Sequence, residues 1–450
     1  MEDSSDLSHL GEKPPIFRIN LSLPPAERYV SLAALYRDRM RALRGMFDDL
    51  VKSLSPKIPV QLIHKLAWLC LHRLRTREET EELRGISKAT DIDMYLLICL
   101  NTVLDLLMGC TSGGARVKSG SSQTKMLHFR TLDWGMDPLR DLIVQLEFIR
   151  DSDPEKVLAT SITYVGFVGV LTGVRENLSA SLNFRPVHDT TRNFRFYANH
   201  LFVLLGLRQS ISSLLRQCIL SPSDTNNQKS SCATLEDIVK TVPGTPTTAA
   251  YLIFSDGSKT VTMEKDHRTA VVRSSSSFIV TTNHDQGPTS ESTEEVAQTK
   301  RESHRGLSLV SSDLQAMEDL IEDSNERRDC IKAKWDNEVR ERNESRNTRL
   351  SAKVEIRPHV ESSGSRSSVR LRKNREDEER LAEAEAKRII LLNPDDYSDV
   401  AITKTTLVKW LTTFPVVNET THYATIMDPC KGEIAWIRRY NVDDWIEEEG

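Results

Sequence analysis

The chain has 450 residues, of which 38% are hydrophobic and 28% are charged, and its formal net charge at pH 7 is −5. That length accommodates one large domain or two ordinary ones, and the slightly acidic balance gives no overall positive field that would favour nucleic acid as a partner. The chain has seven cysteines, an odd number, and no two of them have CxxC spacing. This argues against a disulfide framework and a zinc site, and nothing in the sequence indicates a cofactor.

The amino-terminal residues lack the pattern of a targeting segment. The first 15 residues, MEDSSDLSHLGEKPP, have neither the basic start nor the apolar core of a signal peptide. The most apolar stretch, residues 95–108, is interrupted by Asn101 and Asp105 and is too short to span a bilayer. The sequence as written predicts a soluble intracellular protein, and a lysosomal or vacuolar one only if the true amino terminus differs.

The first hundred residues carry the apolar periodicity of helices. A Pro-Pro pair precedes an amphipathic run over residues 27–54, and two further runs cover 60–74 and 94–108. We therefore expect residues 1–109 to form a helical amino-terminal region.

After Cys110 the pattern changes from helical to strand-like. Residues 111–124 are small, polar and rich in glycine and serine, which predicts a loop. Runs typical of short strands follow, with helices between them. The expected strands cover 126–132, 142–148, 157–163, 178–184, 249–254, 261–264, 278–282, 422–427 and 433–438, and the expected helices cover 198–220, 235–240 and 405–413.

Residues 317–387 are dense in charged and polar side chains and poor in aliphatic and aromatic ones. Such a segment buries too little apolar surface to offset its ordering entropy, so we expect a disordered, charged insertion outside the catalytic core. Within it, residues 376–387 have the charge pattern of a solvated helix. On this interpretation, deleting about residues 320–385 leaves activity and stability nearly unchanged.

The order of the elements indicates an α+β fold. Helices come first, then alternating sets of strands and helices, a pattern typical of antiparallel sheets covered by helices. Residues 110–450 would form the catalytic core, interrupted by the insertion.

The junction between the two regions reads Met108-Gly109-Cys110-Thr111-Ser112. A cysteine is a capable nucleophile only as a thiolate, so it needs a nearby base or a lowered pKa. A cysteine at a new chain terminus gains its own α-amine as base, with a reference pKa of about 7.7–8.0. Gly109 has no side chain to obstruct attack by the thiol on its carbonyl, the acyl shift that precedes self-cleavage. Taken alone, however, Cys110 fits an ordinary buried cysteine better.

Further motifs, in order along the chain, favour the nucleophile. With Cys110-Thr111-Ser112 they are Pro24–Arg28, His128-Phe129-Arg130-Thr131-Leu132-Asp133-Trp134-Gly135, Tyr164–Gly173, Leu182-Asn183, Thr282-Asn283-His284-Asp285 and Tyr423–Asp428. This pattern resembles the acid ceramidase and N-acylethanolamine acid amidase family, fungal-type acid ceramidase-like proteins in particular, within the choloylglycine-hydrolase-like N-terminal-nucleophile hydrolases. The resemblance covers about residues 14–310 and 400–440. It implies a four-layer αββα fold with two stacked antiparallel sheets.

The resemblance also implies a set of site residues. Asp133 would hold the new ammonium group of Cys110, and Arg130 would hold the thiolate and orient the acyl carbonyl. Asn283 would donate an amide N–H to the oxyanion, worth roughly 3–4 kcal/mol of barrier. The implied catalytic set is Cys110, Arg130, Asp133, Asn183, Asn283 and Arg301. Without the resemblance, Arg130 and Asp133 would pass for a surface ion pair and Asn283 for a turn cap.

One position departs from the family pattern. The family usually carries a glutamate directly after the asparagine that corresponds to Asn183, whereas this chain has Phe184, as in the bile-salt-hydrolase branch. If that glutamate assists self-cleavage, Phe184 puts the efficiency of maturation in question.

The substrate implied by the resemblance is an N-acyl lipid, a ceramide or an N-acylethanolamine. We expect Trp134, Tyr164, Phe167 and Val168 to line the substrate site, since the stretch after Tyr164 is apolar and punctuated by glycines, although such stretches are more often core. The expected partners are this lipid, presented from a membrane surface, and the chain's own cleaved amino-terminal fragment, with no nucleic acid. The helical region would cover the acyl channel before cleavage.

Two other functions stay open at this point. The chain is a non-catalytic lipid-binding homologue if it remains uncleaved. It is a papain-like thiol hydrolase if His128 or His284 acts as the base for Cys110, but no partner at a recognisable spacing supports such a triad.

Overall fold

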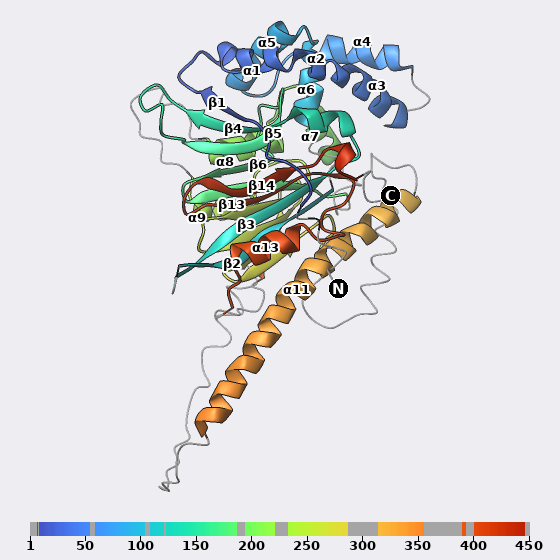
Figure 1. Ribbon diagram of the computed structural model, residues 1–450. Coiled ribbons are helices and arrows are strands. Elements are labelled where there is room, and N and C mark those ends of the chain that lie inside the picture. The colour runs from blue at the N-terminus through green and yellow to red at the C-terminus, as the bar shows by residue number, and fades with distance from the viewer. Residues whose placement is uncertain are drawn as a thin grey trace, which may run out of the picture.

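The structure is a computed structural model that describes residues 7, 9–54, 59–103, 109–120, 123–186, 194–220, 233–286, 314–354, 389–392 and 400–445. Two β-sheets lie face to face, and helices cover their outer sides (Figure 1). This is the α+β, four-layer arrangement that the sequence predicts.

The larger sheet has nine strands within the described residues. Its neighbours are antiparallel except at the two edges, where β1 pairs parallel with β4 and β12 pairs parallel with β10. In sheet order the strands are β1 (Ile16–Asn20), β4 (Ile143–Ile149), β5 (Ala159–Tyr164), β6 (Thr172–Arg175), β7 (Leu178–Phe184), β8 (Ala250–Ser255), β9 (Thr260–Lys265), β10 (Ala270–Ser275) and β12 (Ile389–Leu392).

The smaller sheet has five antiparallel strands in the described part of the chain. In sheet order they are β11 (Phe278–Thr281), β2 (Gly109–Ser119), β3 (Gln123–Asp133), β13 (Thr421–Asp428) and β14 (Glu433–Arg439). The register of β2 against β3 places Gly109 opposite Asp133 and Cys110 opposite Leu132. The peptide bond predicted to be cleaved and the carboxylate predicted to hold the Cys110 ammonium therefore lie at the same end of the paired strands β2 and β3.

The loop expected over residues 111–124 is wrong for most of its length, because residues up to Ser119 belong to β2. The reason is close packing on both faces of the strand. A Cβ at Gly113 would lie 2.1 Å from the carbonyl oxygen of Ile279, and one at Gly114 would lie 2.0 Å from Oγ1 of Thr260. Glycine at 113 thus permits the close approach of β11 within the same sheet, and glycine at 114 permits the close approach of β9 in the other sheet.

The amino-terminal region is helical, as expected, but it is not only helical. Its 3-10 helix and helices are η1 (Pro25–Glu27), α1 (Val30–Leu35), α2 (Arg37–Met40), α3 (Ala42–Leu54), α4 (Val60–Cys70), α5 (Arg77–Thr90) and α6 (Met94–Val103), so the amphipathic run over residues 27–54 is divided among several elements. In addition, β1 forms an edge of the nine-stranded sheet. The region before Cys110 thus contributes a strand to the core.

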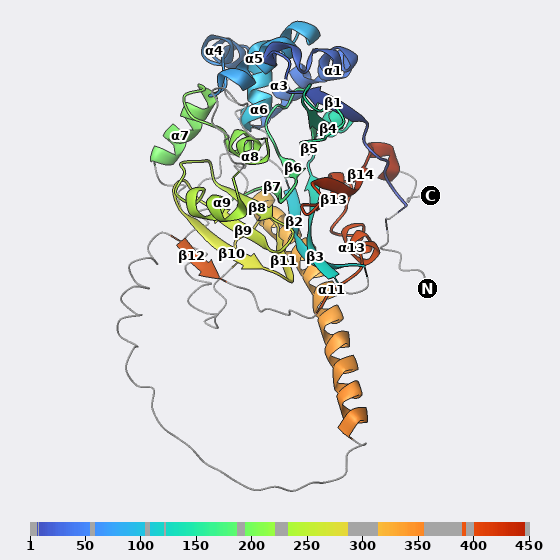
Figure 2. The ribbon, with the colours of Figure 1, turned by 90° about the vertical axis from the view of Figure 1, so that its left-hand side faces the viewer.

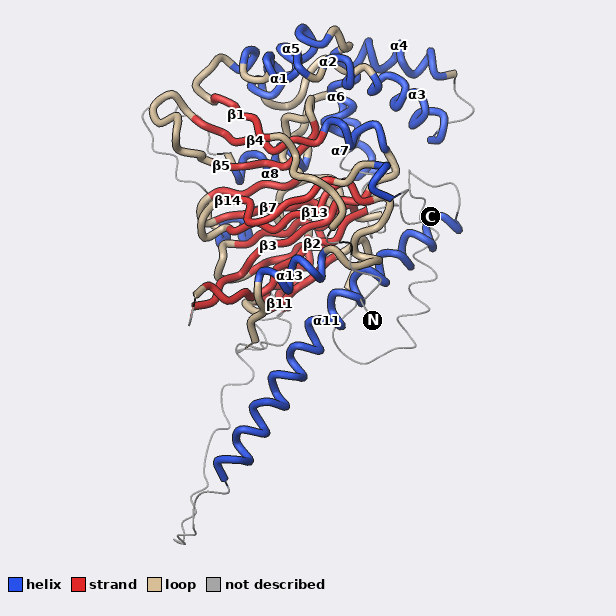
Figure 3. The backbone as a smooth tube through the Cα atoms, in the orientation of Figure 1, coloured by secondary structure: helices blue, strands red, loops and turns tan. Residues whose placement is uncertain are grey.

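The helices that follow lie against the sheets and the amino-terminal region. α8 (Ile211–Ile219) and α9 (Leu235–Thr241) bury apolar residues in the main core with the nine-stranded sheet, and α7 (Phe194–Leu204) packs against α6 (Figure 3). The single helix expected over 198–220 is two helices, separated near Gly206, whose φ is +65°. Short 3-10 helices η3 (Asp137–Leu142) and η4 (Val442–Trp445) complete the described elements.

Residues 314–354 form one long helix, α11 (Leu314–Val354), which packs with α13 (Lys404–Leu411) on the five-stranded sheet and then extends beyond it (Figures 1 and 2). The side chains of Ile331, Trp335 and Val339 are buried there, and the Trp335 ring stacks on Phe278 at a centroid distance of 4.9 Å. The expected insertion outside the core is therefore wrong for residues 319–344. One apolar residue per helical turn suffices to bury a stripe, although the segment is polar overall. Residues 355–387, including the helix expected at 376–387, lie outside the described residues.

Candidate active site

Cys110 is fully buried at the second position of β2, between the two sheets. Its backbone N–H donates a hydrogen bond to Oδ1 of Asn283 (2.7 Å), and its Sγ lies 3.3 Å from Nη2 of Arg130. Burial raises the pKa of the thiol, and the positive charge of Arg130 opposes that shift. With Gly109 still attached, the thiol is thus protonated at neutral pH and needs a base before it can attack.

Arg130 comes from β3, the strand next to β2, and its side chain is also completely buried. Its guanidinium donates to the carbonyl of Leu171 and to Oγ1 of Thr172 (2.7 Å), so one edge of the fork is anchored on the nine-stranded sheet. Nε has no hydrogen-bond partner in the described part of the chain. A buried cationic donor beside a thiol can stabilise a thiolate or an oxyanion.

Asn283 lies just beyond β11, as the sequence predicts, and is buried beside Cys110. Its Oδ1 accepts the Cys110 N–H, and it also accepts Nη2 of Arg327 at 3.2 Å. Its Nδ2 donates to the carbonyl of Phe184 (2.8 Å). The contact between Asn283 and Cys110 is therefore made to the backbone nitrogen of Cys110, the atom that the sequence predicts to become an α-amine.

Asp133 is buried at the end of β3, facing Gly109 rather than Cys110. Its carboxylate accepts Oγ1 of Thr421 (2.8 Å) and Nη1 of Arg327 (3.1 Å). Burial raises the pKa of Asp133, and the charge of Arg327 opposes that shift. The carboxylate thus lies opposite Gly109 and is fixed by two partners, one from β13 and one from α11.

Arg327 is the site residue that sequence reasoning missed. Its side chain is 1% exposed and contacts Asp133, Asn283 and Oγ1 of Thr111 (3.1 Å). The resemblance predicts Arg301 as a further arginine of the site, and Arg301 lies outside the described residues. The available signal was the spacing of Arg327, Ile331, Trp335 and Val339, four residues apart in an otherwise polar segment, which marks one helix face.

Asn183 ends β7 one residue before Phe184, on the opposite sheet from Cys110. Its Oδ1 accepts Oγ of Ser112 (2.7 Å), and its Nδ2 donates to the carbonyls of Thr281 (3.1 Å) and Thr282 (3.3 Å). Asn183 thus joins β2 and β11 to the nine-stranded sheet. In this arrangement its side chain holds the framework around the thiol and is not directed at the thiol itself.

Neither histidine is arranged as a base for Cys110. Both ring nitrogens of His128 lie 2.9 Å from serine hydroxyls of β7, and burial lowers its pKa to about 3. His284 bonds through Nδ1 to Ser324 (2.8 Å) and through Nε2 to Arg328 (3.2 Å). These contacts argue against the papain-like alternative.

The residues expected to line the substrate site are all buried. The ring of Trp134 packs edge-on against Tyr164, whose hydroxyl lies 2.8 Å from Nδ1 of His422. Phe167 and Val168 follow in a segment covered by α6. Asn101 of α6 holds this segment at both ends, donating to the carbonyl of Gly166 (2.9 Å) and accepting the N–H of Val168 (2.8 Å).

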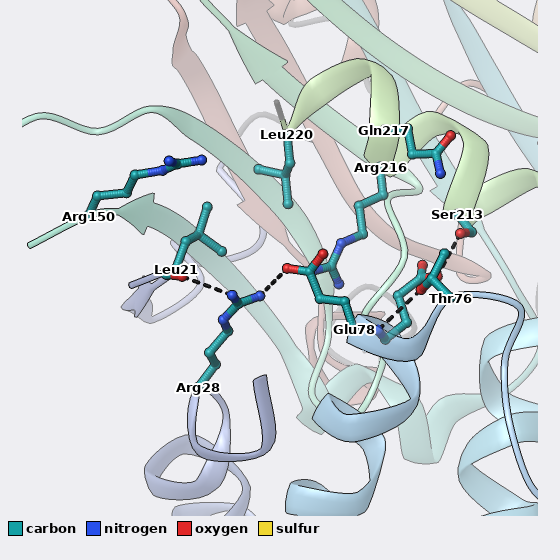
Figure 4. A pocket seen from close by; sticks show the side chains of 10 residues that line it. Leu21, Arg28, Thr76, Glu78, Arg150, Ser213, Arg216, Gln217 and Leu220 are labelled. Carbon is teal, nitrogen blue, oxygen red and sulfur yellow. Dashed lines mark hydrogen bonds and ion pairs between the residues drawn. The ribbon is translucent and has the colours of Figure 1, made fainter. Parts of the chain in front are cut away.

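A cavity of about 340 Å³ opens between the amino-terminal region and the core (Figure 4). None of the residues that contact Cys110 lines it; Arg28, Glu78, Arg150 and Arg216 do. Beside it, Glu82 of α5 lies 2.9 Å from Arg28 and 2.6 Å from Arg216 of α8. Burial raises the pKa of Glu82, and the charge of Arg216 opposes that shift. This buried network joins the amino-terminal region to the core.

Comparison with known proteins shows which families this chain resembles in sequence. Residues 12–74 match the family model described as the beta subunit of N-acylethanolamine-hydrolyzing acid amidase. The chain is 29% identical over 184 residues to the N-acylethanolamine-hydrolyzing acid amidase of Caenorhabditis elegans, covering 38% of this chain and 48% of that protein. It is 30% identical over 190 residues to the acid ceramidase of Homo sapiens, covering 38% and 45%. In sequence the chain is therefore similar to members of the acid ceramidase and N-acylethanolamine acid amidase family.

The matches cover slightly less than half the length of these relatives. Among solved structures, a Caenorhabditis elegans ortholog of N-acylethanolamine-hydrolyzing acid amidase is 19% identical, with a TM-score of 0.39, over 71% of this chain and 93% of that one. At that score the likeness carries no argument. Within the described residues, no helix is both long and apolar enough to cross a membrane, and no group of three metal-ligating side chains is found.

Proposed function

We propose that this chain belongs to the family it resembles and is an N-terminal-nucleophile amidase that hydrolyses the amide bond of an N-acyl lipid, a ceramide or an N-acylethanolamine. The observation that carries the proposal is the environment of Cys110. Its nitrogen is bound by Asn283, its sulfur lies beside Arg130, and the carboxylate of Asp133 faces Gly109. In an N-terminal-nucleophile enzyme the sulfur of one residue is the nucleophile and its nitrogen is the base. Both atoms therefore need polar groups beside them, as Cys110 has.

Maturation would begin with attack of the Cys110 sulfur on the carbonyl carbon of Gly109. The acyl group moves from nitrogen to sulfur, and water then hydrolyses the thioester. The products are the Gly109 carboxylate and the free α-amine of Cys110. The chain has Phe184 in place of the family glutamate. The buried carboxyl of Asp133, whose pKa is raised, lies opposite Gly109 and would act as the acid for cleavage instead.

Turnover would use the new α-amine as base. The amine takes the thiol proton, the sulfur attacks the lipid amide carbonyl, and the resulting oxyanion is stabilised by Arg130 and Asn283. The protonated amine then gives its proton to the departing amine, leaving an acyl thioester. Water hydrolyses this thioester to the fatty acid. An amide nitrogen carries two hydrogens, so the bond from Asn283 to Phe184 is compatible with donation to an oxyanion.

The acyl chain would bind where the segment 164–171 now packs beneath α6. Gly166 lies close to Met40 and Leu100 of the amino-terminal region, so this region covers the segment in the uncleaved chain. α6 ends at Val103, six residues before Gly109. Cleavage frees the carboxyl end of the fragment that contains α6, which would let the helix move away from an acyl chain.

The lipid would be presented from a membrane surface by the amino-terminal region. On α4, the side chains of Leu62, Leu66, Trp68 and Leu69 are 49–65% exposed. α4 has no acidic residue and is followed by basic ones. An exposed apolar stripe with basic neighbours is the composition of an interfacial helix.

The second candidate function is an uncleaved lipid-binding homologue, which Phe184 favours. Intact mass under denaturing conditions separates the two. The amidase yields two chains, one beginning with Cys110, and the binding protein stays a single chain. A single chain that is inactive on N-acyl amides would rule out the amidase.

A further inference from the structure

The two strand ends that carry Asn183 and Asn283 belong to different sheets. Asn183 ends β7 of the nine-stranded sheet, and Asn283 follows β11 of the five-stranded sheet. No backbone ladder joins β7 to β11, so sheet hydrogen bonding does not set their relative position. Between them run the side-chain bonds already described, from Asn183 to Thr281 and Thr282 and from Asn283 to Phe184.

Directly beyond this crossing lies an ion pair between Arg185 and Asp285. Arg185 donates two hydrogen bonds to the Asp285 carboxylate, Nε to Oδ1 (2.7 Å) and Nη2 to Oδ2 (2.6 Å). Its Nη1 donates to Asp266 (2.7 Å), and the hydroxyl of Tyr251 donates to Asp285 (2.7 Å). The Arg185 side chain is 4% exposed, whereas Asp285 is 41% exposed.

We propose that Arg185 and Asp285 are positioning residues for the active site. Arg185 lies two residues after Asn183, just beyond the end of β7, and Asp285 lies two residues after Asn283 in the segment that follows β11. The pair sets the separation of the two sheet edges. It thereby also sets the position of Oδ1 of Asn283, which accepts the hydrogen bond from the Cys110 backbone N–H. The inference rests on the proposed amidase function, because it gives that function its geometry.

The chemistry of the pair suits this task better than the neutral amide bonds beside it. A guanidinium and a carboxylate joined by two parallel bonds fix both a distance and an angle. Burial opposes ionisation of Asp285, but the hydrogen bonds and charge of Arg185 hold the pKa of Asp285 below its usual value. The pair therefore stays ionised at neutral and mildly acidic pH. Because Arg185 is buried, removing its partner leaves a charge compensated mainly by Asp266.

The test compares Asp285→Asn and Arg185→Lys with Lys125→Met. Lys125 pairs with Asp428 at the other end of β3 and β13 from Cys110, so it is a matched ion pair between neighbouring strands outside the site. Self-cleavage rate, kcat, KM and thermal midpoint are measured for each, with hydrogen exchange in the segment 278–286. We expect kcat and self-cleavage to fall about 10- to 100-fold in the first two variants, since misplacement by about 1 Å costs about 10² in rate. KM should change less than about threefold, and exchange in 278–286 should accelerate.

Lys125→Met should lower the thermal midpoint and leave kcat and exchange in 278–286 unchanged. The proposal is overturned if, at an equal loss of thermal midpoint, Asp285→Asn and Arg185→Lys lower kcat no more than Lys125→Met does. It is also overturned if hydrogen exchange in residues 278–286 is unchanged in the first two variants. If the wild-type chain neither cleaves nor turns over, the proposed function fails. The exchange comparison still decides whether the pair fixes the two sheet edges.

Discussion

The guanidinium of Arg327 and the carboxylate of Asp133 lie 3.1 Å apart, although 194 positions separate them in the chain. The contact brings a helix made mostly of polar and charged residues into the centre of the candidate site. The same guanidinium reaches Asn283, so one buried cation bridges two of the residues expected to act on Cys110.

The first prediction concerns this contact. Arg327→Ala should lower kcat by about 10²-fold or more, because it leaves the buried Asp133 carboxylate without its cation and frees the Asn283 oxygen. Arg327→Lys should recover only part of the loss, since a lysine cannot make the three-way contact of a guanidinium. Arg340→Ala, on an exposed position of the same helix, is the control. If Arg327→Lys has the kcat of the wild type, the contacts that only a guanidinium can make are not needed for catalysis.

The second prediction concerns the stability that α11 provides. Trp335→Ala should lower the free energy of unfolding by about 3–5 kcal/mol, the usual cost of truncating a buried tryptophan. Trp68→Ala, at a position 65% exposed, should cost much less. Chemical denaturation of both variants gives the comparison. Equal losses would mean that α11 does not pack on the five-stranded sheet, and the deletion of residues 320–385 would again be expected to be harmless.

The third prediction concerns maturation. The precursor should split into residues 1–109 and 110–450, and the fragments should stay associated through β1 and the Glu82 network. Cys110→Ala should abolish the split, because no nucleophile remains. Cys218→Ala, at another buried cysteine, should cleave normally. Intact mass and size exclusion are the measurements, and cutting of the Cys110→Ala chain at this bond would indicate an external protease.

The fourth prediction compares Asn283→Ala with Asp133→Asn in material already cleaved at Cys110. Asn283→Ala should lower kcat by about two to three orders of magnitude and keep the shape of the pH–rate profile. Asp133→Asn should move the limb set by the α-amine towards lower pH, because the ammonium loses a nearby negative charge. Profiles on a long-chain N-acyl amide test both. A wild-type profile in either variant would exclude that residue from catalysis.

A stability measurement checks the same carboxyl independently of activity. Burial raises the pKa of Asp133 in the folded chain, so the folded state binds this proton more tightly than the unfolded state. Its contribution to stability is full below the unfolded pKa of about 3.9 and is lost as pH rises through the folded value. Asp133→Asn should therefore flatten the fall of the thermal midpoint with rising pH. An unchanged slope would contradict the assigned burial effect.

The fifth prediction concerns the apolar stripe of α4. Replacing Trp68 and Leu69 by serine should reduce sedimentation with anionic phosphatidylserine-containing vesicles by about tenfold or more, because two exposed apolar anchors are removed. Phe414→Ser is the control, because Phe414 is 56% exposed and lies three residues beyond α13, a helix that Figure 1 shows well apart from α4. Activity on detergent-dispersed substrate should be retained. Equal vesicle binding by the double variant and the wild type would contradict a membrane face on α4.

The sequence by itself determined the helical start of the chain, most strands, and the placement of Asp133 and Asn283 at or just beyond the ends of strands. These follow from local periodicity and from motifs whose members lie within a few residues of each other. Alternating burial and helical spacing are properties of short windows, so they are visible without the fold.

Only the tertiary structure decided that β2 is a strand, that Asn183 serves the framework, and that Arg327 enters the site. The composition around Gly113 and Gly114 suggests a loop. Only the strands packed closely against these two glycines show that they belong to β2. The segment around Arg327 has too few apolar residues to predict order from its own composition. Its helix gains its burial from Phe278 and Trp410, which the chain supplies from distant positions. Packing energy of this kind depends on which side chains a residue contacts in the fold, and the composition of a segment does not reveal those contacts.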